Sequence, residues 1–295
     1  MQEVVVEKNA SRLDCYLSQV LGLSRSKISK MIKEKNVFVN GINKKGSSNI
    51  FKNDIIRYEI KDDEVKFKAE DIALNIVYED DDVIVVNKQN GMVVHPAVGN
   101  KSGTLANALM YHSNHLSKIN GNFRPGIVHR IDAYTTGLLM VAKNDKAHLF
   151  LQKQLQEKTI TRKYIALVWG VISSDTGLID APITRDKKDR KKMTVGLGKE
   201  AITHFKVIER FEKATLIELK LETGRTHQIR VHMNYIGHPV VNDPLYGRRK
   251  LIDETGQCLH AKTIGFIHPT KKIYMEFDSE LPSCFINILN KFKED

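Results

Sequence analysis

Apolar residues follow a helical spacing near the start of the chain and a strand-like spacing further on. They recur at helical intervals over 13–20 and again over 28–32, which predicts two short helices. The second helix follows Ser24, a residue type that commonly caps helices. A short strand over 37–39 then closes in an Asn-Gly turn, and residues 50–60 supply a further strand pair. The first sixty residues are therefore predicted to form a small α+β module.

Beyond a charged stretch, the pattern changes to short apolar strands with helical segments between them. Strands are expected at 74–78, 83–87, 92–94, 137–142, 164–169 and 216–221, and helices at 104–112, 146–157 and 226–235. Several strands come in close pairs joined by turns, rather than alternating strictly with helices. This predicts an α+β fold: a mixed, largely antiparallel sheet with flanking helices. The expected organisation is a module over 1–62, a linker over 63–71 and a larger domain over 72–295.

The composition favours a globular protein with a polyanionic partner. The 295 residues are 41% hydrophobic, and 46 Lys and Arg face 35 Asp and Glu, a net charge of +11. Such an excess favours nucleic acid, since no stretch looks like a basic amphipathic membrane anchor. No apolar run approaches the ~18 residues that span a bilayer, and the start of the chain lacks a signal core. Three scattered cysteines form no disulfide framework or zinc knuckle, so we expect a cytoplasmic protein.

The second predicted helix is strongly basic. It carries four cations, Arg25, Lys27, Lys30 and Lys33, and only Glu34 opposes them. A charge run of this kind is either a solvated face or a contact for nucleic acid, and the single sign favours the second. The segment "SRLDCYLSQVLGLSRSKISKMIKEKNVFVNG" resembles the small two-helix RNA-binding module named after a small-subunit ribosomal protein. That resemblance implies RNA binding but names no reaction.

Familiar catalytic motifs are absent from the sequence. There is no phosphate-binding P-loop, no dinucleotide-binding GxGxxG, no GxSxG nucleophile elbow and no HExxH. His227 and His232 are five residues apart, roughly 140° around a helix, so they do not easily share a metal. We therefore expect no metal and no cofactor.

A carboxylate among basic residues is a candidate reactive group. Asp132 follows His129 and Arg130, and precedes a Thr-Thr-Gly turn that leads into the strand at 137–142. On a loop at a strand entrance, a carboxylate can serve as a nucleophile or general base while a guanidinium keeps it ionised. It can equally stabilise the turn. A second segment, 223–232, places a turn and a Thr226 cap before a helix whose start carries Arg225. This is either an anion site or an ordinary surface helix.

Together these motifs resemble the RNA pseudouridine synthases of the large family that modifies ribosomal and transfer RNA. The matching segments are "GIVHRIDAYTTGLLMVAK" and "LETGRTHQIRVHMNYIGHPVVNDPLYG", with "VVNKQNGMVVHP", "TRKYIALVWG" and "QCLHAKTIGFIHP" in the same order. The likeness covers nearly all of residues 70–295. The attached N-terminal module fits the branch that acts on large-subunit ribosomal RNA. Gln89-Asn90 departs from the Pro-Ala or Pro-Ser common in relatives.

The resemblance implies roles for particular residues. Asp132 would be the catalytic aspartate, paired with Arg225, and Tyr164 would stack on or near the target uracil. Arg130 would fill the space that the flipped base leaves, and Ile229 would form part of an apolar wall. The reaction, isomerisation of uridine to pseudouridine within RNA, requires no redox agent, metal or nucleotide cofactor.

Two further expectations concern a basic loop and the partner of the protein. Residues 185–192 hold six basic and two acidic residues and are predicted to be a mobile loop that contacts RNA phosphates, or a solvated excursion. The expected partner is RNA, above all large-subunit ribosomal RNA, bound by a monomer. The alternative is a non-catalytic ribosomal-RNA binding or assembly factor on the same fold.

Overall fold

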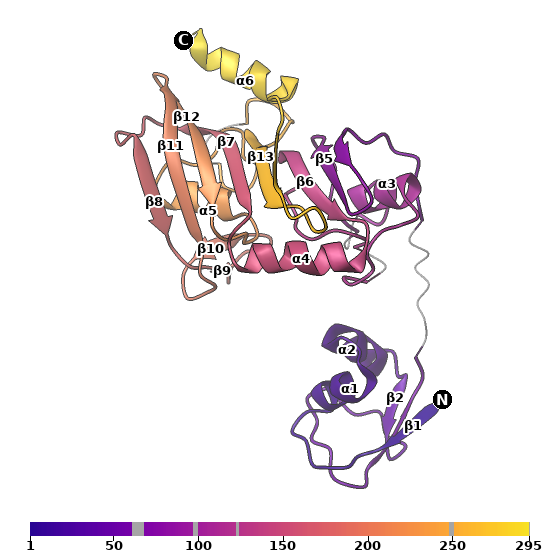
Figure 1. Ribbon diagram of the computed structural model, residues 1–295. Helices are drawn as coiled ribbons and strands as arrows, with labels where there is room; N and C mark the ends of the chain where they lie inside the picture. Colours follow the sequence, from indigo (N-terminus) through magenta and orange to yellow (C-terminus); the bar gives the residue numbers. More distant parts are fainter. Residues whose placement is uncertain (61–67, 97–99, 122–123, 248–250, 295) are drawn as a thin grey trace. The chain divides into compact units, whose positions relative to one another are not determined.

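The computed structural model describes residues 1–60, 68–96, 100–121, 124–247 and 251–294 (Figure 1). The chain divides into two compact units, Met1–Lys66 and Phe67–Asp295. The predicted linker at 63–71 lies largely outside the described residues.

The N-terminal unit is a three-stranded antiparallel sheet with two helices. Its elements are β1 (Gln2–Val5), α1 (Leu13–Leu21), α2 (Arg25–Lys33), β2 (Val37–Val39) and β3 (Ile55–Tyr58), with sheet order β1-β3-β2. Ser24 caps α2 as predicted, because its hydroxyl accepts the Lys27 N–H. Leu13, Leu17 and Ile28 are fully buried in the core of this unit.

One prediction for this unit is wrong. Residues 50–60 do not form a strand pair: Ile50 makes only an isolated bridge to Ala10, and the strand begins at Ile55. The reason is that β3 is the central strand and pairs on both sides with other segments. One of these partners is β1, which the sequence pattern did not reveal.

The second unit is built on a nine-stranded sheet. Its strands are β4 (Ile76–Glu79), β5 (Val83–Lys88), β6 (Thr136–Ala142), β7 (Thr161–Trp169), β8 (Thr176–Asp180), β11 (Ile202–Arg210), β12 (Ala214–Leu221), β13 (Leu259–Ile267) and β14 (Tyr274–Asp278). The order is β4-β5-β6-β13-β7-β12-β11-β8, and β14 pairs with β13. Every pairing is antiparallel except that of β6 with β13, so the predicted mixed, largely antiparallel sheet is confirmed.

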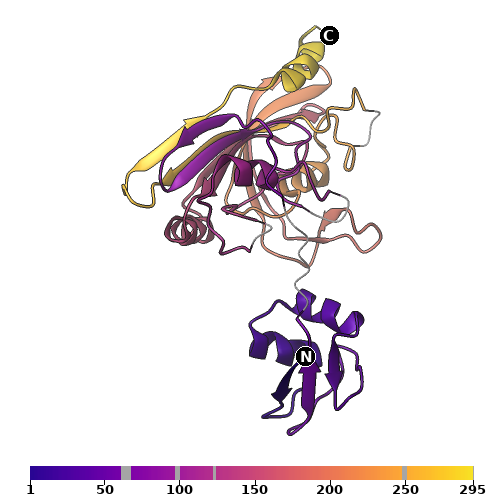
Figure 2. The same cartoon turned by 90° about the vertical axis from the view of Figure 1, so that its right-hand side faces the viewer.

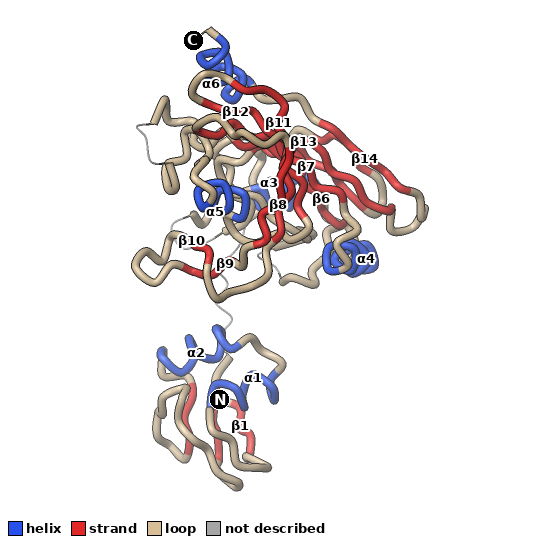
Figure 3. Tube along the Cα trace, turned by 90° about the vertical axis from the view of Figure 1, so that its left-hand side faces the viewer, coloured by secondary structure: helices blue, strands red, loops and turns tan. Residues whose placement is uncertain are grey.

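Helices cover both faces of this sheet, as Figure 3 shows. The remaining elements are α3 (Leu105–His112), α4 (Asp145–Gln156), α5 (Gln228–Tyr235), α6 (Ser283–Lys293) and a small hairpin, β9 (Ile183–Arg185) with β10 (Met193–Val195). Alternate residues of β5 point to opposite faces. Ile84 belongs to the core under α3 and α5, and Val83 to the core under α4. Burial on both faces explains why β5 and β6 are almost continuously apolar.

The sheet forks beside the start of β6. The first part of β13 pairs with β6, and the later part pairs with β14 instead, which lies alongside β4 and β5 in Figure 2. At the fork, a Cβ on Gly137 would lie 2.3 Å from the Ala261 carbonyl oxygen, and Gly137 has φ +106°. Only glycine allows the two backbones this close approach. The contact fixes the strand that follows the Asp132 loop.

Residues 92–94 are not a strand, contrary to the prediction. Met92 and Val94 are buried, but the carbonyl oxygens of Val93 and Val94 accept the N–H groups of Leu105 and Ala106 at the start of α3. These backbone groups therefore satisfy a helix N-terminus rather than a neighbouring strand.

Candidate active site

Asp132 lies on the loop that enters β6, as predicted, and a buried lysine holds that loop. Lys88 is 1% exposed, and its Nζ donates to the carbonyl oxygens of Gln89, Met92 and Ala133 at 2.8–2.9 Å. Burial lowers the pKa of Lys88 to about 7, while the Asp132 carboxylate raises it. Three carbonyl acceptors match the three N–H bonds of the ammonium form. Lys88 thus ties the end of β5 to the residue directly after Asp132.

The ion pair of Asp132 is made by Arg230 and not by Arg225. Arg230 Nη1 donates to Asp132 Oδ2 at 2.8 Å, while Arg225 Nε donates to the carbonyl oxygen of Glu200. The predicted Arg225–Asp132 pair is therefore wrong. Arg225 belongs to the turn before α5, and Arg230 lies in the first turn of that helix and faces the loop.

The same guanidinium is clamped from behind by a second carboxylate. Arg230 Nε and Nη2 donate to the two oxygens of Asp243 at 2.7 and 2.9 Å, a bidentate pair. The Asp243 side chain is fully buried and that of Arg230 is 6% exposed, whereas the Asp132 side chain retains 17% exposure. Asp132 is therefore the most exposed of the three side chains. Arg230 and Asp243 both lie in the motif at 221–247, but only their contacts in the folded structure show that they belong to the site.

The helix that carries Arg230 begins later than predicted. Its N-cap is His227, in a left-handed conformation without a side-chain cap, and Thr226 does not cap it. Buried Gln228 fixes this start: its Oε1 accepts the Arg225 N–H, and its Nε2 donates to Ile202 and Thr203 of β11. The contact with β11 therefore decides which arginine faces Asp132.

His227 lies between Asp132 and Tyr246. Its Nε2 lies 3.8 Å from Asp132 Oδ1, and its Nδ1 lies 2.8 Å from the Tyr246 hydroxyl. The Tyr246 ring also lies under the Arg230 guanidinium, 5.0 Å from its centre. Burial lowers the pKa of His227, although the charge of Asp132 raises it, so the ring is neutral at pH 7.

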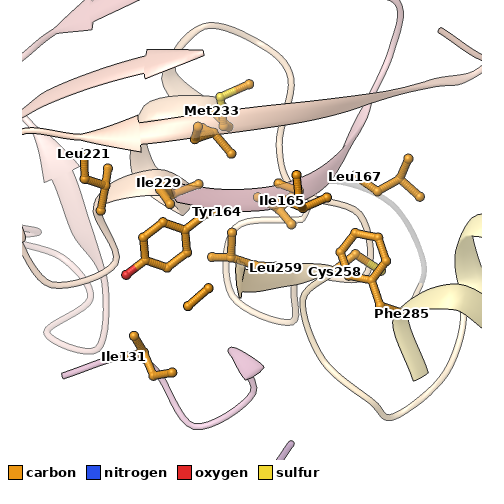
Figure 4. Close-up of a cluster of buried hydrophobic side chains, with 14 of the residues drawn as sticks. Ile131, Tyr164, Ile165, Leu167, Leu221, Ile229, Met233, Cys258, Leu259 and Phe285 are labelled. Carbon is orange, nitrogen blue, oxygen red and sulfur yellow. The ribbon is translucent and has the colours of Figure 1, made fainter. Parts of the chain in front are cut away.

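A cavity of about 550 Å³ opens in front of Asp132. Tyr164 from β7 lines it, among the apolar side chains of Ile131, Leu221, Ile229 and Leu259 (Figure 4). Burial raises the pKa of Tyr164, so its hydroxyl keeps its proton at neutral pH. Lys158, Arg130, Arg162 and Arg225 also line the cavity. An aromatic ring, an apolar wall and several cations around one carboxylate suit a planar base attached to a phosphodiester chain.

Comparisons with known proteins place this site in a family. A family model described as RNA pseudouridylate synthase matches residues 82–235. The chain is 52% identical over 292 residues to an uncharacterized RNA pseudouridine synthase of Bacillus subtilis, covering 98% of this chain and 96% of that protein. The chain belongs to the RNA pseudouridylate synthase family. The resemblance found in the motifs is thereby confirmed, as is the enzyme class.

Other relatives of the synthase are similar over most of their length. It is 41% identical over 309 residues to ribosomal large subunit pseudouridine synthase D of Pseudomonas aeruginosa, covering 99% of this chain and 95% of that protein. Among solved structures, human RNA pseudouridylate synthase domain containing 1 aligns with a TM-score of 0.59 at 26% identity. That alignment covers 76% of this chain and 96% of the human one.

Arg130 of the synthase is exposed at the mouth of the cavity. Its Nη1 lies 3.3 Å from His95 Nε2. Burial and the neighbouring charge of Arg130 lower the pKa of His95 to about 4, so the neutral ring accepts a hydrogen bond there. Arg130 makes no ion pair within the described residues, which leaves its charge available to a ligand.

The basic segment 185–192 of the synthase is a turn with internal hydrogen bonds, and its predicted mobility and contact with RNA phosphates stay predictions. It joins β9 to β10, and two aspartates organise it. The Asp186 carboxylate accepts the N–H groups of Lys188 and Asp189, and the Asp189 carboxylate accepts that of Lys191. At its base, the Met193 N–H donates to the Tyr246 hydroxyl, so the hairpin adjoins the site.

In the N-terminal unit of the synthase, Arg25, Lys30 and Lys33 are exposed and Lys27 is half-buried. Arg25 Nη2 lies 3.3 Å from Asp14, and Lys30 Nζ lies 3.7 Å from Glu34. Asp14 is buried, whereas the Lys30–Glu34 pair is exposed, and exposed ion pairs are weak. All four cations belong to α2, where three of them are exposed.

Across the part of the chain that the structure describes, no group of three His, Cys, Asp or Glu side chains is placed to hold a metal ion. Within the same residues, no helix combines the length and apolar character needed to cross a membrane.

Proposed function

We propose that the synthase converts uridines of large-subunit ribosomal RNA into pseudouridine, with Asp132 as the catalytic group. The observation that carries this proposal is the geometry of Asp132: a carboxylate held by buried Arg230 at the wall of a cavity that also contains Tyr164. The choice of RNA rests on relatives named ribosomal large subunit pseudouridine synthase D, 38–50% identical to this chain.

The reaction is an isomerisation, so its atoms and electrons balance without an external reagent. The bond between uracil N1 and ribose C1′ breaks, and a bond between uracil C5 and C1′ forms. Carbon five loses a proton and N1 gains one. Asp132 serves as a nucleophile toward the sugar or base, or as the base that removes a ribose proton; either role needs an ionised carboxylate. The hydrogen bond from Arg230 holds this carboxylate in place.

The target base must leave its helix to reach Asp132. Unstacking a base costs a few kcal/mol, which contacts in the pocket must offset. Tyr164 supplies a stacking surface, and base–aromatic stacking contributes ~1–3 kcal/mol. Ile229 forms part of the apolar wall around the base. Arg130, at the cavity mouth, occupies the space that the base has left in the RNA.

Basic elements outside the cavity hold the surrounding RNA. The 185–192 turn adjoins the site through Met193 and Tyr246, and its six cations bind phosphates next to the target. Arg25, Lys27, Lys30 and Lys33 of the N-terminal unit bind more distant phosphates of the same RNA. We expect the enzyme to act as a monomer in the cytoplasm, where ribosomes assemble.

Pseudouridine mapping tests the proposal. Carbodiimide labelling of ribosomal RNA from cells that lack the protein should show the loss of one or a few pseudouridines. Wild-type protein should restore them, and Asp132→Asn protein should not. An unchanged map together with defective large subunits would favour the assembly-factor alternative.

A further inference from the structure

The backbone of His227 is unusual for a residue with a large side chain. It has φ 56° and ψ 20°, and as N-cap of α5 its side chain makes no capping hydrogen bond. Non-glycine residues adopt this left-handed conformation rarely, and they do so where surrounding structure enforces it, often at functional sites. The conformation has a clear consequence here: it turns the imidazole into the cavity beside Asp132.

The hydrogen bonds around this imidazole assign its proton. The Tyr246 hydroxyl accepts the Met193 N–H at 2.8 Å and lies 2.8 Å from His227 Nδ1. Because the hydroxyl already accepts the Met193 N–H, its own proton is free to be donated, and we assign that proton to the hydrogen bond with Nδ1. The neutral imidazole then carries its proton on Nε2, and this N–H faces Asp132 Oδ1 at 3.8 Å. The opposite tautomer would turn a lone pair toward the carboxylate.

The two oxygens of the Asp132 carboxylate are held unequally. Oδ2 accepts a short hydrogen bond from Arg230, whereas Oδ1 lies 3.8 Å from Nε2 of His227. A carboxylate bound through one oxygen can still rotate about the bond to its Cβ. Contacts that are long in an empty site often tighten when substrate fills it, and 3.8 Å is about 0.7 Å from hydrogen-bond distance.

We propose that His227 is a positioning residue: its Nε2–H, oriented by Tyr246, holds Oδ1 of Asp132 while Arg230 holds Oδ2. The two donors together set the plane of the carboxylate and its direction toward the nucleotide. The inference rests on the proposed role of Asp132 as the reacting group. It adds a chain of contacts from β10 through Tyr246 and His227 to that group.

Kinetics of matched variants test the proposal in the full chain. His227→Asn keeps a residue that tolerates the left-handed backbone, but its amide is too short to reach Asp132. We expect kcat to fall on the order of 10–100-fold, with KM within threefold of wild type, because misplacing a reacting group costs rate more than binding. His227→Gln places an amide N–H near the position of Nε2 and should recover part of kcat. The assay is tritium release from a large-subunit ribosomal RNA transcript that contains [5-³H]uridine.

A spectroscopic measurement separates orientation from general structural support. In protein labelled with ¹⁵N-histidine, the His227 ring should show the tautomer protonated at Nε2. Tyr246→Phe removes the hydroxyl that fixes this tautomer, so both tautomers should appear, and kcat should fall while the melting temperature changes little.

The outcomes are distinct. Loss of kcat in His227→Asn with partial recovery in His227→Gln supports the proposal, whereas a wild-type kcat in His227→Asn overturns it. If His227→Asn does not fold, Tyr246→Phe decides: a wild-type kcat, or an Nδ1-protonated ring in the wild type, overturns it. Full activity of Asp132→Asn on the same transcript would instead refute the proposed function itself.

Discussion

Positive charge is used differently around Asp132 and on α2. Arg230 is almost completely buried, and its guanidinium is shared between two carboxylates at 2.7–2.9 Å. Lys30 and Lys33 on α2 are exposed, and the ion pair of Lys30 with Glu34 spans 3.7 Å. Buried charge pairs are held strongly because removing one partner leaves the other desolvated. Exposed charges are screened by salt and move freely.

This difference in burial predicts different functions for the two groups of cations. The buried group around Arg230 can hold a reacting carboxylate in one geometry, but it can contribute little to the attraction of a distant polyanion. The cations of α2 can attract the phosphates of an RNA, but they do not hold a reacting group in one fixed geometry. Residues 1–68 hold 14 Lys and Arg against 9 Asp and Glu, which gives 14 − 9 = +5 of the total +11. Variants that disturb each region should therefore fail in different assays.

The largest effect is expected for Asp132→Asn. The amide keeps the shape of the side chain but is neither nucleophilic nor basic, so turnover should fall at least ~10²–10⁴-fold. RNA affinity should stay within about threefold, because the charges that bind RNA are elsewhere. Tritium release and filter binding measure the two quantities. Turnover within threefold of wild type would contradict the role given to Asp132.

Arg230→Ala should combine lost activity with lost stability. It leaves the fully buried Asp243 without its partner, and breaking a buried pair costs ~3–5 kcal/mol. For a unit of this size the melting temperature should fall on the order of 10 °C. Calorimetry measures it, with Arg225→Ala as the matched control from the same motif. Equal melting temperatures for both variants would mean that the ion pair contributes nothing to stability.

The cations of α2 should affect binding and not chemistry. Lys30→Gln with Lys33→Gln should flatten the salt dependence of binding to large-subunit ribosomal RNA by about 1.5 in logarithmic slope, since each phosphate contact contributes ~0.7–0.9. Lys291→Gln with Lys293→Gln is the control, because these lysines also lie in the last turn of a helix. Turnover on a short stem-loop should be unchanged in both. Identical slopes for the two double variants would remove α2 from the RNA interface.

The smallest effect concerns acid stability. Burial by itself raises the pKa of Asp243, but the hydrogen bonds and charge of Arg230 outweigh it and hold the pKa below its ordinary value. In the unfolded chain this carboxyl titrates near ~3.9, so below that pH the unfolded state binds more protons. The stabilisation is therefore complete above pH ~4 and is lost as pH falls through the lower folded pKa. Denaturant titrations from pH 5 to 2 should show a shallower pH slope for Asp243→Asn than for wild type.

Local sequence determined much of this protein. The capped helix after Ser24, the buried strands β5 and β6 and the location of Asp132 on a loop before β6 all follow from short-range patterns. Each depends on neighbouring residues: a cap needs a nearby backbone N–H, and a strand buried on both faces needs an unbroken apolar run. The ordered motifs also determined the family, because they preserve the order of its functional segments.

Tertiary structure alone decided which arginine serves Asp132. Arg225 and Arg230 lie in the same motif, and each could be placed near a helix start. Gln228, held by β11 residues more than twenty positions earlier, sets where α5 begins, and so turns Arg230 toward the loop. The pairing of β1 with β3 was not predicted for the same reason. These features depend on contacts between segments that are far apart in the sequence. A local pattern of residues carries no information about the energies of such contacts.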